Sequence, residues 1–389
     1  MSLQVHEAPA VIFIQQLLEK AITVGASDIH IESCKDRLRV RLRVDGLLYD
    51  DSSIMQEYAA QSIARVKVLA RLDVSERRIP QDGKFFIALN SQTIDLRVST
   101  FPALHGEKIV IRILDTAGAL LDINHIGLTQ PMLKVIKKLI TKAHGFFLVT
   151  GPTGSGKTTT LYALLHAVIS SEKNIVTLED PIEYTIEGIT QSQVQSEIGF
   201  TFARGIRSLV RQDPDVIMVG EIRDTETAQV AIQAALTGHL VLSTLHTADA
   251  PSTLLRLLDM DIEPFLLNSA LTAVLTQRLA RKICTSCRIE VAMTNEQAEL
   301  IKRYDLPITQ CFKGTGCRYC YGVGSKGRIG IFELLVISHA LRALMTSKPD
   351  FADLYKQALD DNMIPMLLDG ASKVQDGIIS FEELMRIML

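Results

Sequence analysis

The chain has 389 residues, with 47% hydrophobic and 22% charged side chains and a formal net charge of −3. That length exceeds one ordinary hydrophobic core and the composition excludes a disordered protein, so we expect two or three globular domains. The near-neutral charge also argues against a protein that binds nucleic acid electrostatically over its whole surface.

The sequence carries neither a membrane span nor an export signal. Its apolar runs fall short of the roughly 18 residues that cross a bilayer. Its start, MSLQVHEAPAVIFIQQLLEK, lacks the basic segment and small-residue cleavage site of a secretory signal. We therefore expect a cytoplasmic protein.

Residues 1–115 alternate helical and strand patterns. In DRLRVRLRVDG (36–46), arginines alternate with apolar residues, which predicts a half-buried strand with a basic face. These arginines are Arg37, Arg39, Arg41 and Arg43. A solvated face is the first interpretation, and a grip on a nucleic-acid backbone is the alternative. The stretch KFFIALNSQTIDLRVSTF predicts a hairpin turning at Asn90-Ser91, and EKIVIRILD predicts a further strand.

The remaining chain changes pattern three times. Turn residues in 116–128 predict a linker, and residues 129–281 alternate apolar strands with helical segments, which predicts a parallel sheet with helices on both faces. Most of the cysteines fall in the segment 282–325, and residues 326–389 have a helical composition. Ser380 and Glu383 have the spacing of a capping box, so we expect a helix to begin there.

A phosphate-binding loop is predicted at GPTGSGKTT, between an apolar strand and a helical pattern. Its glycines let backbone N–H groups point at a phosphate, and the following helix adds its positive amino end. Lys157 is placed to reach the β- and γ-phosphates and Thr158 to bind magnesium. The alternative, a glycine-rich turn with an incidental lysine, does not explain the strand–loop–helix context. The predicted nucleotide-binding residues are Gly151, Pro152, Thr153, Gly154, Ser155, Gly156, Lys157, Thr158 and Thr159.

Acidic residues end two predicted strands. DVIMVGE ends in Glu221, but Gly220 stands where an aspartate that helps to hold magnesium is usual, and NIVTLED ends in Glu179 and Asp180. If these strands are neighbours, two further acids stand near the metal, and Glu221 can orient or deprotonate the attacking water. A turn-forming pair before Pro181 is the alternative for Glu179 and Asp180. We interpret Gly220 as a variant of a working site.

Five arginines are further candidates. Arg204, Arg207 and Arg211 share one helix face before the strand of Glu221, where phosphate or subunit contacts and a solvated stripe are equal alternatives. Arg112 lies on a strand that is apolar on both faces, which predicts a half-buried guanidinium in need of an anion. Arg97 lies on the polar side of its strand, where a surface ion pair is the simpler interpretation.

Two C-x-x-C pairs, Cys284 with Cys287 and Cys317 with Cys320, predict a four-thiolate zinc site of the closed, structural kind. An iron–sulfur cluster or a redox pair is the alternative. Cys311 and Cys34 are left over, and we expect them to be spare.

Together these motifs resemble those of the ATPases that drive type II secretion and type IV pilus assembly. They are the Walker A loop GPTGSGKTTTLYALL, the Asp box TLEDPIEY, the glycine-containing Walker B strand of LVRQDPDVIMVGEIRD, the His box GHLVLSTLHTADAP and the paired C-x-x-C. The likeness spans almost the whole chain and is closest to the type II secretion branch.

The resemblance implies a set of catalytic residues. They are Lys157, Glu179, Asp180, Glu221, Arg97, Arg112, Arg207, Arg211, His239 and His246. In the family, Glu221 would be the catalytic glutamate, the first-domain arginines would close over the phosphates, and the core arginines would lie near the nucleotide and the subunit boundary. The two histidines would link the nucleotide to a neighbouring subunit. On sequence alone, either histidine is equally an ordinary residue at a strand end.

The implied fold is α/β, with a PAS-like α+β domain (1–115), a RecA-like P-loop core (129–281), a zinc-binding insertion (282–325) and a helical C-terminal subdomain (326–389). The implied ligands are ATP, magnesium and zinc. Family members form hexameric rings at the bacterial inner membrane, held there by a bitopic partner's cytoplasmic domain and a polytopic membrane protein. Full-length members carry a further N-terminal docking domain that has no match here, so a truncated chain stays an alternative.

The predicted function is an ATP-hydrolysing motor that powers pseudopilus assembly in type II secretion. Type IV pilus extension is the alternative within the family. A nucleic-acid-dependent ATPase and a nucleotide-gated scaffold without turnover are alternatives from other classes. We expect no nucleic-acid partner, because the basic strand has no interleaved aromatic residues.

Overall fold

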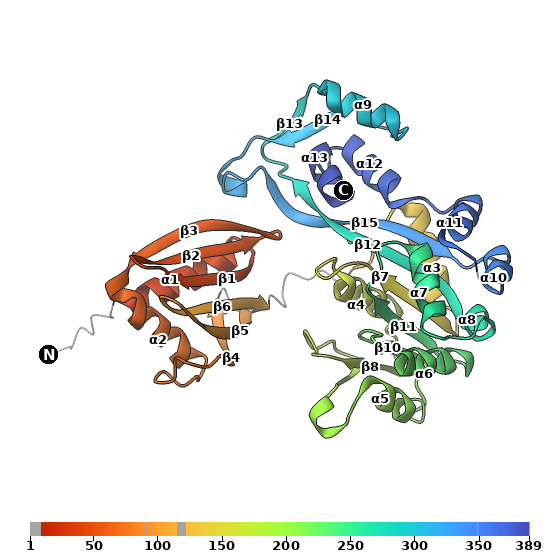
Figure 1. Ribbon diagram of the computed structural model, residues 1–389, viewed down its shortest axis with the longest axis horizontal. Coiled ribbons are helices and arrows are strands. Elements are labelled where there is room, and N and C mark those ends of the chain that lie inside the picture. Colours follow the sequence, from red (N-terminus) through yellow and green to blue (C-terminus); the bar gives the residue numbers. More distant parts are fainter. Residues whose placement is uncertain (1–8, 90–91, 115–121, 348, 389) are drawn as a thin grey trace. The chain divides into compact units, whose positions relative to one another are not determined.

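The computed structural model describes residues 9–89, 92–114, 122–347 and 349–388. The chain divides into two compact units, Met1–Ala119 and Leu120–Leu389 (Figure 1). Each unit has its own hydrophobic core. The predicted turn at Asn90-Ser91 and residues 116–121 of the predicted linker lie outside the described residues.

The N-terminal unit is built on a six-stranded antiparallel sheet with the order β3-β2-β1-β6-β5-β4. Its strands are β1 (Ala26–Ser33), β2 (Arg37–Val44), β3 (Leu47–Met55), β4 (Gln81–Leu89), β5 (Gln92–Ala103) and β6 (Gly106–Leu114). The helices α1 (Pro9–Thr23) and α2 (Ala59–Leu69), the latter preceded by η1 (Gln56–Tyr58), supply apolar side chains to the core of this unit. An antiparallel sheet can bury one face in this way and leave the other to water.

The predicted alternation on β2 is confirmed. Three of its four apolar residues are buried, whereas its arginines lie on the opposite face, and three of them pair with acids of neighbouring strands. The pairs are Arg39 with Asp50 at 2.6 Å, Arg41 with Glu32 at 2.7 Å and Arg43 with Asp28 at 3.8 Å. The basic face is therefore a solvated face on which acids compensate much of the charge.

A seven-stranded sheet forms the centre of the C-terminal unit, in the order β15-β12-β7-β11-β10-β8-β9 (Figure 1). Its strands are β7 (Gly145–Thr150), β8 (Ile175–Glu179), β9 (Thr190–Gln193), β10 (Val216–Val219), β11 (Leu240–Leu245), β12 (Leu271–Ile283) and β15 (Ser325–Val336). The strands from β12 to β9 run parallel to their neighbours, and β15 runs antiparallel to β12. The predicted parallel sheet is thus confirmed.

Helices cover both faces of this sheet, as predicted. Alternate residues of β7 point to opposite faces: Phe146 and Leu148 join one core, Phe147 and Val149 the other. The first core includes α5 (Phe202–Leu209), α6 (Thr225–Leu236), α7 (Ala250–Asp259) and α8 (Pro264–Ala270), and the second includes α3 (Gln130–Ile140) and α4 (Lys157–Val168). The short η2 (Ser196–Ile198) precedes α5. Burial on both faces explains why these strands are apolar without alternation.

The cysteine-bearing segment is an excursion between β12 and β15. It contains the antiparallel pair β13 (Arg288–Val291) and β14 (Cys311–Gly314), the helix α9 (Asn295–Arg303) and η3 (Arg318–Cys320). Thr294 caps α9 in a complete capping box with Gln297.

The C-terminal segment becomes helical later than predicted, because residues 325–336 form β15. Its run IFELLV is short and, except for Val336, buried, and such a run cannot be assigned to helix or strand by periodicity. The helices that follow are α10 (His339–Met345), α11 (Phe351–Asp360), α12 (Met366–Gln375) and α13 (Phe381–Met388). The predicted helix start is confirmed, since Ser380 Oγ accepts a hydrogen bond from Glu383 N at 3.2 Å.

Candidate active site

The predicted phosphate loop connects β7 to α4 at the carboxyl edge of the parallel sheet. Gly151, Gly154 and Gly156 have φ angles of 143°, 78° and 86°, in the region that favours glycine. A Cβ atom on Gly151 would lie 2.3 Å from the carbonyl oxygen of Gln277, so this glycine also permits close packing against β12. No side chain caps the amino end of α4 at Gly156, which leaves its N–H groups and positive dipole for an anion.

Lys157 lies folded over this loop. Its Nζ donates to the carbonyl oxygens of Gly151 at 2.9 Å and Pro152 at 3.0 Å, and it lies 3.4 Å from His246 Nδ1. Burial lowers the pKa of Lys157, and the nearby Glu221 carboxylate raises it in part. The ammonium group is therefore held by neutral partners at the position where phosphate oxygens bind in such loops.

Glu221 follows β10, two strands from β7, and His246 bridges it to the lysine. Glu221 Oε2 lies 3.5 Å from His246 Nε2, while Arg223 Nη2 donates to Glu221 Oε1 at 2.5 Å. Burial would raise the pKa of Glu221, but Arg223 and His246 outweigh it and hold the pKa below its usual value. The carboxylate is thus kept ionised beside the loop and can accept a proton.

Gly220 is not required by packing. A Cβ atom there would lie 3.4 Å from the carbonyl oxygen of Leu178 and 3.5 Å from Glu179 Cα, which are ordinary contact distances. β8 neighbours β10, which meets the condition set in the sequence analysis, so the acids at the ends of these two strands lie at one edge of the sheet. Asp180, 38% exposed, reaches Arg223 Nη1 at 3.6 Å.

Glu179 is placed differently from Asp180, because its side chain is 3% exposed and points into a hydrogen-bond network. Thr177 Oγ1 donates to Oε1 at 2.6 Å, Gln191 Nε2 donates to the same oxygen at 3.0 Å, and Tyr162 OH donates to Oε2. Tyr162 belongs to α4 and packs edge-on against Tyr184 at 4.5 Å. Glu179 therefore ties the Asp-box loop to the helix of the phosphate loop.

Three predicted residues of the core are not brought together with Lys157 and Glu221. Arg207 pairs with Glu226 of α6 at 2.7 Å, and Arg211 donates to the backbone of Arg207 at 2.5 Å. His239 precedes β11, and its Nδ1 lies 2.8 Å from the carbonyl oxygen of Ala234. A strand of this length places His239 roughly 20 Å from the carboxyl edge that carries His246. The sequence contained a signal for this separation, because His239 stands before the predicted strand and His246 stands after it.

In the N-terminal unit, Arg97 and Arg112 stand opposite each other on β5 and β6, and Lys84 stands opposite Arg97 on β4. Arg112 Nε lies 3.0 Å from Asp28 Oδ1. The predicted half-burial of Arg112 is wrong: its side chain is 65% exposed, because its face of β6 is opposite the face whose isoleucines enter the core. Lys84, Arg97 and Arg112 thus form a row of three cations across the sheet, in which Arg112 is paired with Asp28.

The sequence patterns did not point to Arg223, Gln277 or Arg278. Gln277 Nε2 donates to the carbonyl oxygen of Ser155 at 2.6 Å, and Arg278 lines a cavity beside the loop. Both lie on β12, far from the loop in the sequence, and no local motif marks them. Arg223 follows Glu221 by two residues, a spacing that places both side chains on the same side of an extended segment.

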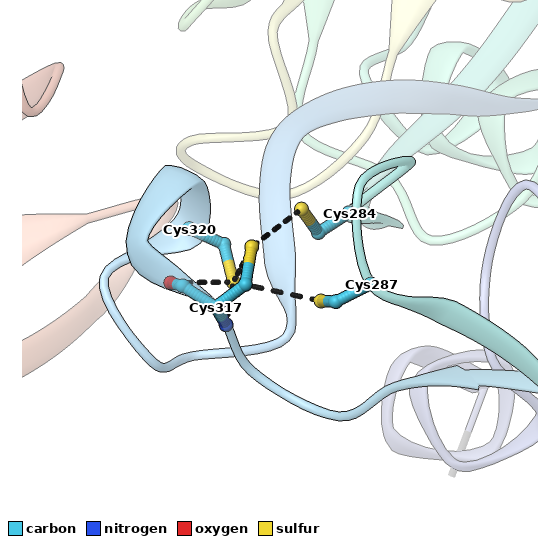
Figure 2. A group of neighbouring side chains, drawn as sticks. All are labelled: Cys284, Cys287, Cys317 and Cys320. Carbon is cyan, nitrogen blue, oxygen red and sulfur yellow. Dashed lines mark hydrogen bonds between the residues drawn. The ribbon is translucent and has the colours of Figure 1, made fainter.

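The four predicted metal ligands converge from two loops (Figure 2). Their sulfur atoms all lie within 4.8 Å of one another, with 3.8 Å between Cys284 and Cys317 and 3.7 Å between Cys287 and Cys320. Four thiolates about 2.3 Å from a central zinc ion would be about 3.8 Å apart, so the donor set fits a tetrahedral metal. Cys311 is buried in a separate apolar cluster, consistent with its expected exclusion from the site.

The backbone groups around the four sulfur atoms also suit thiolate ligands. The backbone N–H groups of Cys317 and Gly324 donate to Cys320 Sγ at 3.1 and 3.2 Å. Burial would raise the pKa of the Cys320 thiol, but these donors and the neighbouring thiols outweigh it and lower the pKa to about 6. N–H groups aimed at a sulfur stabilise the thiolate that a metal requires.

A family model described as "Type II/IV secretion system protein" matches residues 4–386. The chain belongs to this family. It is 46% identical to the type II secretion system ATPase E of Vibrio cholerae, over 98% of this chain and 76% of that protein. It is 44% identical to the type II secretion system protein E of Pseudomonas aeruginosa, over 99% of this chain and 76% of that protein.

Two solved structures are similar in fold. The pilus retraction motor PilT with bound ADP is similar with a TM-score of 0.64 and 25% identity, over 96% of each chain. The ATPase DotB of Yersinia pseudotuberculosis is similar in fold, with a TM-score of 0.71 and 21% identity over 99% of this chain and 96% of that one. The predicted fold class and the predicted resemblance are thereby confirmed. Within the described residues, no helix combines the length and apolar character needed to cross a bilayer.

Proposed function

We propose that the chain hydrolyses ATP as a motor subunit that powers pseudopilus assembly in type II secretion. One observation carries the catalytic part: His246 links the lysine of the phosphate loop to Glu221, with Nδ1 3.4 Å from Lys157 Nζ and Nε2 3.5 Å from a Glu221 oxygen. The Lys157 ammonium, which can bind phosphate, and the ionised Glu221 carboxylate, which can activate water, thus lie at the same edge of the sheet. The relatives named for type II secretion support the biological part.

In the proposed reaction, residues 151–159 bind the triphosphate through backbone N–H groups and the amino end of α4. Lys157 exchanges the carbonyl oxygens of Gly151 and Pro152 for β- and γ-phosphate oxygens. Glu221 takes a proton from a water molecule, whose oxygen bonds to the γ-phosphorus while the bond to the bridging oxygen of ADP breaks. Because Arg223 and His246 keep Glu221 ionised, this base is available at neutral pH.

Magnesium, when bound, neutralises phosphate charge during this transfer. Thr158, exposed in the first turn of α4, and Asp180, exposed directly after β8, offer the hard oxygen ligands that magnesium prefers. We assign Glu179 a positioning role instead, since three neighbouring donors already occupy its oxygens. The proposed site therefore does not need an aspartate at the position of Gly220.

The remaining predicted residues fit roles in an assembly. We propose a hexameric ring at the cytoplasmic face of the inner membrane, held there by a bitopic partner and a polytopic membrane protein. In it, Arg97 and Arg112 would contact the phosphates from the N-terminal unit, and Arg207 and Arg211 would act at the subunit boundary. The zinc-bearing segment would be a structural module. The acid-paired arginines of β2 speak against a nucleic-acid partner.

Phosphate release from ATP by the full chain tests the proposal, with Lys157→Ala and Glu221→Gln as variants. We expect Lys157→Ala to abolish both nucleotide binding and hydrolysis. Glu221→Gln should bind ATP as the parent does, yet turn over on the order of 10²-fold more slowly, because it removes the base. Parental turnover in Glu221→Gln would contradict the proposed mechanism, and stimulation by DNA or RNA would favour the nucleic-acid alternative.

A further inference from the structure

A cavity of about 440 Å³ opens beside the phosphate loop in the C-terminal unit. Its walls come from three places: the loop itself, the segment after β11, and β12. The lining residues are Pro152, Thr153, His246, Thr247, Ala248 and Arg278. Arg278 thus brings a guanidinium to the same space that His246 and the loop border.

The present partners of Arg278 do not satisfy its guanidinium. Nη1 donates to the carbonyl oxygen of Ile387 in the last turn of α13, and Nε is buried without a hydrogen-bond partner. Glu333, on the neighbouring strand β15, directs its carboxylate elsewhere, to the N–H groups of Ala250 at 2.9 Å and Met366 at 3.4 Å. The hydrogen-bond partner of this cation is therefore a neutral carbonyl group, and the Glu333 carboxylate interacts with it only through its charge, without a hydrogen bond.

A half-buried guanidinium with five donors is poorly served by one carbonyl oxygen, and an anion is the partner it favours. Its planar fork matches phosphate oxygens better than any other side chain does. The adjacent Gln277 holds β12 against the loop through its hydrogen bond to Ser155 O, and Gly151 packs closely on Gln277 O. The strand position of Arg278 is therefore fixed relative to the phosphate loop.

We propose that Arg278 binds the terminal phosphate of ATP and, in doing so, leaves the carbonyl oxygen of Ile387. This inference rests on the proposed binding of ATP by the loop. ADP lacks the terminal phosphate, so with ADP the guanidinium stays on α13. Arg278 thereby distinguishes the two nucleotides and passes the difference to the C-terminal helix.

Titration calorimetry with magnesium and either ADP or a non-hydrolysable ATP analogue tests this on the full chain. For Arg278→Gln, we expect the affinity for the analogue to fall about 10-fold or more, because a charge-assisted bond to phosphate is lost. Its affinity for ADP should stay within about twofold of the parental value, which also shows that the variant folds. Arg342→Gln is the matched control, since Arg342 is half-buried and donates to the backbone oxygen of Leu271 at 3.2 Å. It should leave both affinities unchanged.

Hydrogen exchange in α13 provides the second readout. In the parent, the analogue should raise amide exchange in Phe381–Met388 and ADP should not. In Arg278→Gln, exchange there should be fast in every state and insensitive to nucleotide. If Arg278→Gln binds neither nucleotide, Arg278→Lys is measured in its place. Parental affinity for ADP together with a reduced affinity for the analogue in Arg278→Lys supports the proposal.

Three results would overturn the inference. The first is that Arg278→Gln binds the analogue with parental affinity. The second is that Arg278→Lys loses affinity for both nucleotides equally. The third is that the analogue does not change amide exchange in α13 of the parent. Each of these leaves the proposed ATP site intact as long as the parent binds ATP. Failure of the parent to bind either nucleotide would instead remove the proposed function itself.

Discussion

Glu383 fastens the last helix to the central sheet, and its charge can be tested through the pH dependence of stability. Its side chain is 4% exposed and accepts hydrogen bonds from Arg281 N at 2.9 Å, from the Arg281 guanidinium at 2.5 Å and from Arg386 at 2.7 Å. Burial alone would raise the pKa of Glu383. The two guanidinium groups and the backbone N–H outweigh burial and lower the pKa to about 2, from 4.5.

The sign of the effect follows from this depression. Because the pKa is lower in the folded chain than in the unfolded one, the stabilisation is complete above pH 4.5 and is lost as the pH falls toward about 2. A gap of about 2.5 pH units corresponds to roughly 3 kcal/mol of unfolding free energy. Glu383→Gln removes the charge at every pH. We therefore expect it to lose about 3 kcal/mol at pH 7 and little relative to the parent near pH 2.

Urea unfolding followed by far-UV circular dichroism measures this difference at several pH values. The matched control is Glu382→Gln, because Glu382 lies next in the sequence on the same helix and accepts from Gln297 Nε2 at the protein surface. Its loss should change the stability by less than about 0.5 kcal/mol. The reasoning is refuted if Glu383→Gln matches the parent at pH 7, or if the difference persists unchanged at pH 2.5.

Three other expectations can be measured with single variants. Tyr162→Phe removes one donor from the buried carboxylate of Glu179 and should cost about 1.5–3 kcal/mol in urea unfolding, so parental stability would contradict the positioning role. His246→Ala breaks the link between the lysine and the base. It should slow single-turnover hydrolysis on the order of 10²-fold with ADP affinity retained, and an unchanged rate would exclude His246 from the site. Cys320→Ser should lower zinc from one ion per chain to a trace by elemental analysis, whereas retained zinc would disprove the four-thiolate site.

The features that sequence alone predicted are local ones. The phosphate loop, its flanking strand and helix, and each C-x-x-C pair are encoded within a dozen consecutive residues, because turn chemistry and side-chain periodicity act over that range. The alternating arginines of β2 are predictable for the same reason. For His246 the sequence left two alternatives open, a site residue and an ordinary residue at a strand end. The parallel order of the sheet places it after its strand, on the edge where the acids follow neighbouring strands.

Tertiary structure decided which of these residues meet. Glu179 and Asp180 are adjacent in the sequence, yet the first points into the Tyr162 network and the second toward Arg223, because successive strand residues face opposite sides. Gln277 and Arg278 reach the phosphate loop because β12 lies directly beside β7, which the sequence of neither strand reveals. Strand order depends on the summed packing of whole helices and strands, so it is a property of the complete core. The local pattern determined what chemistry the chain carries, and the packing of the sheet determined which side chains can perform it together.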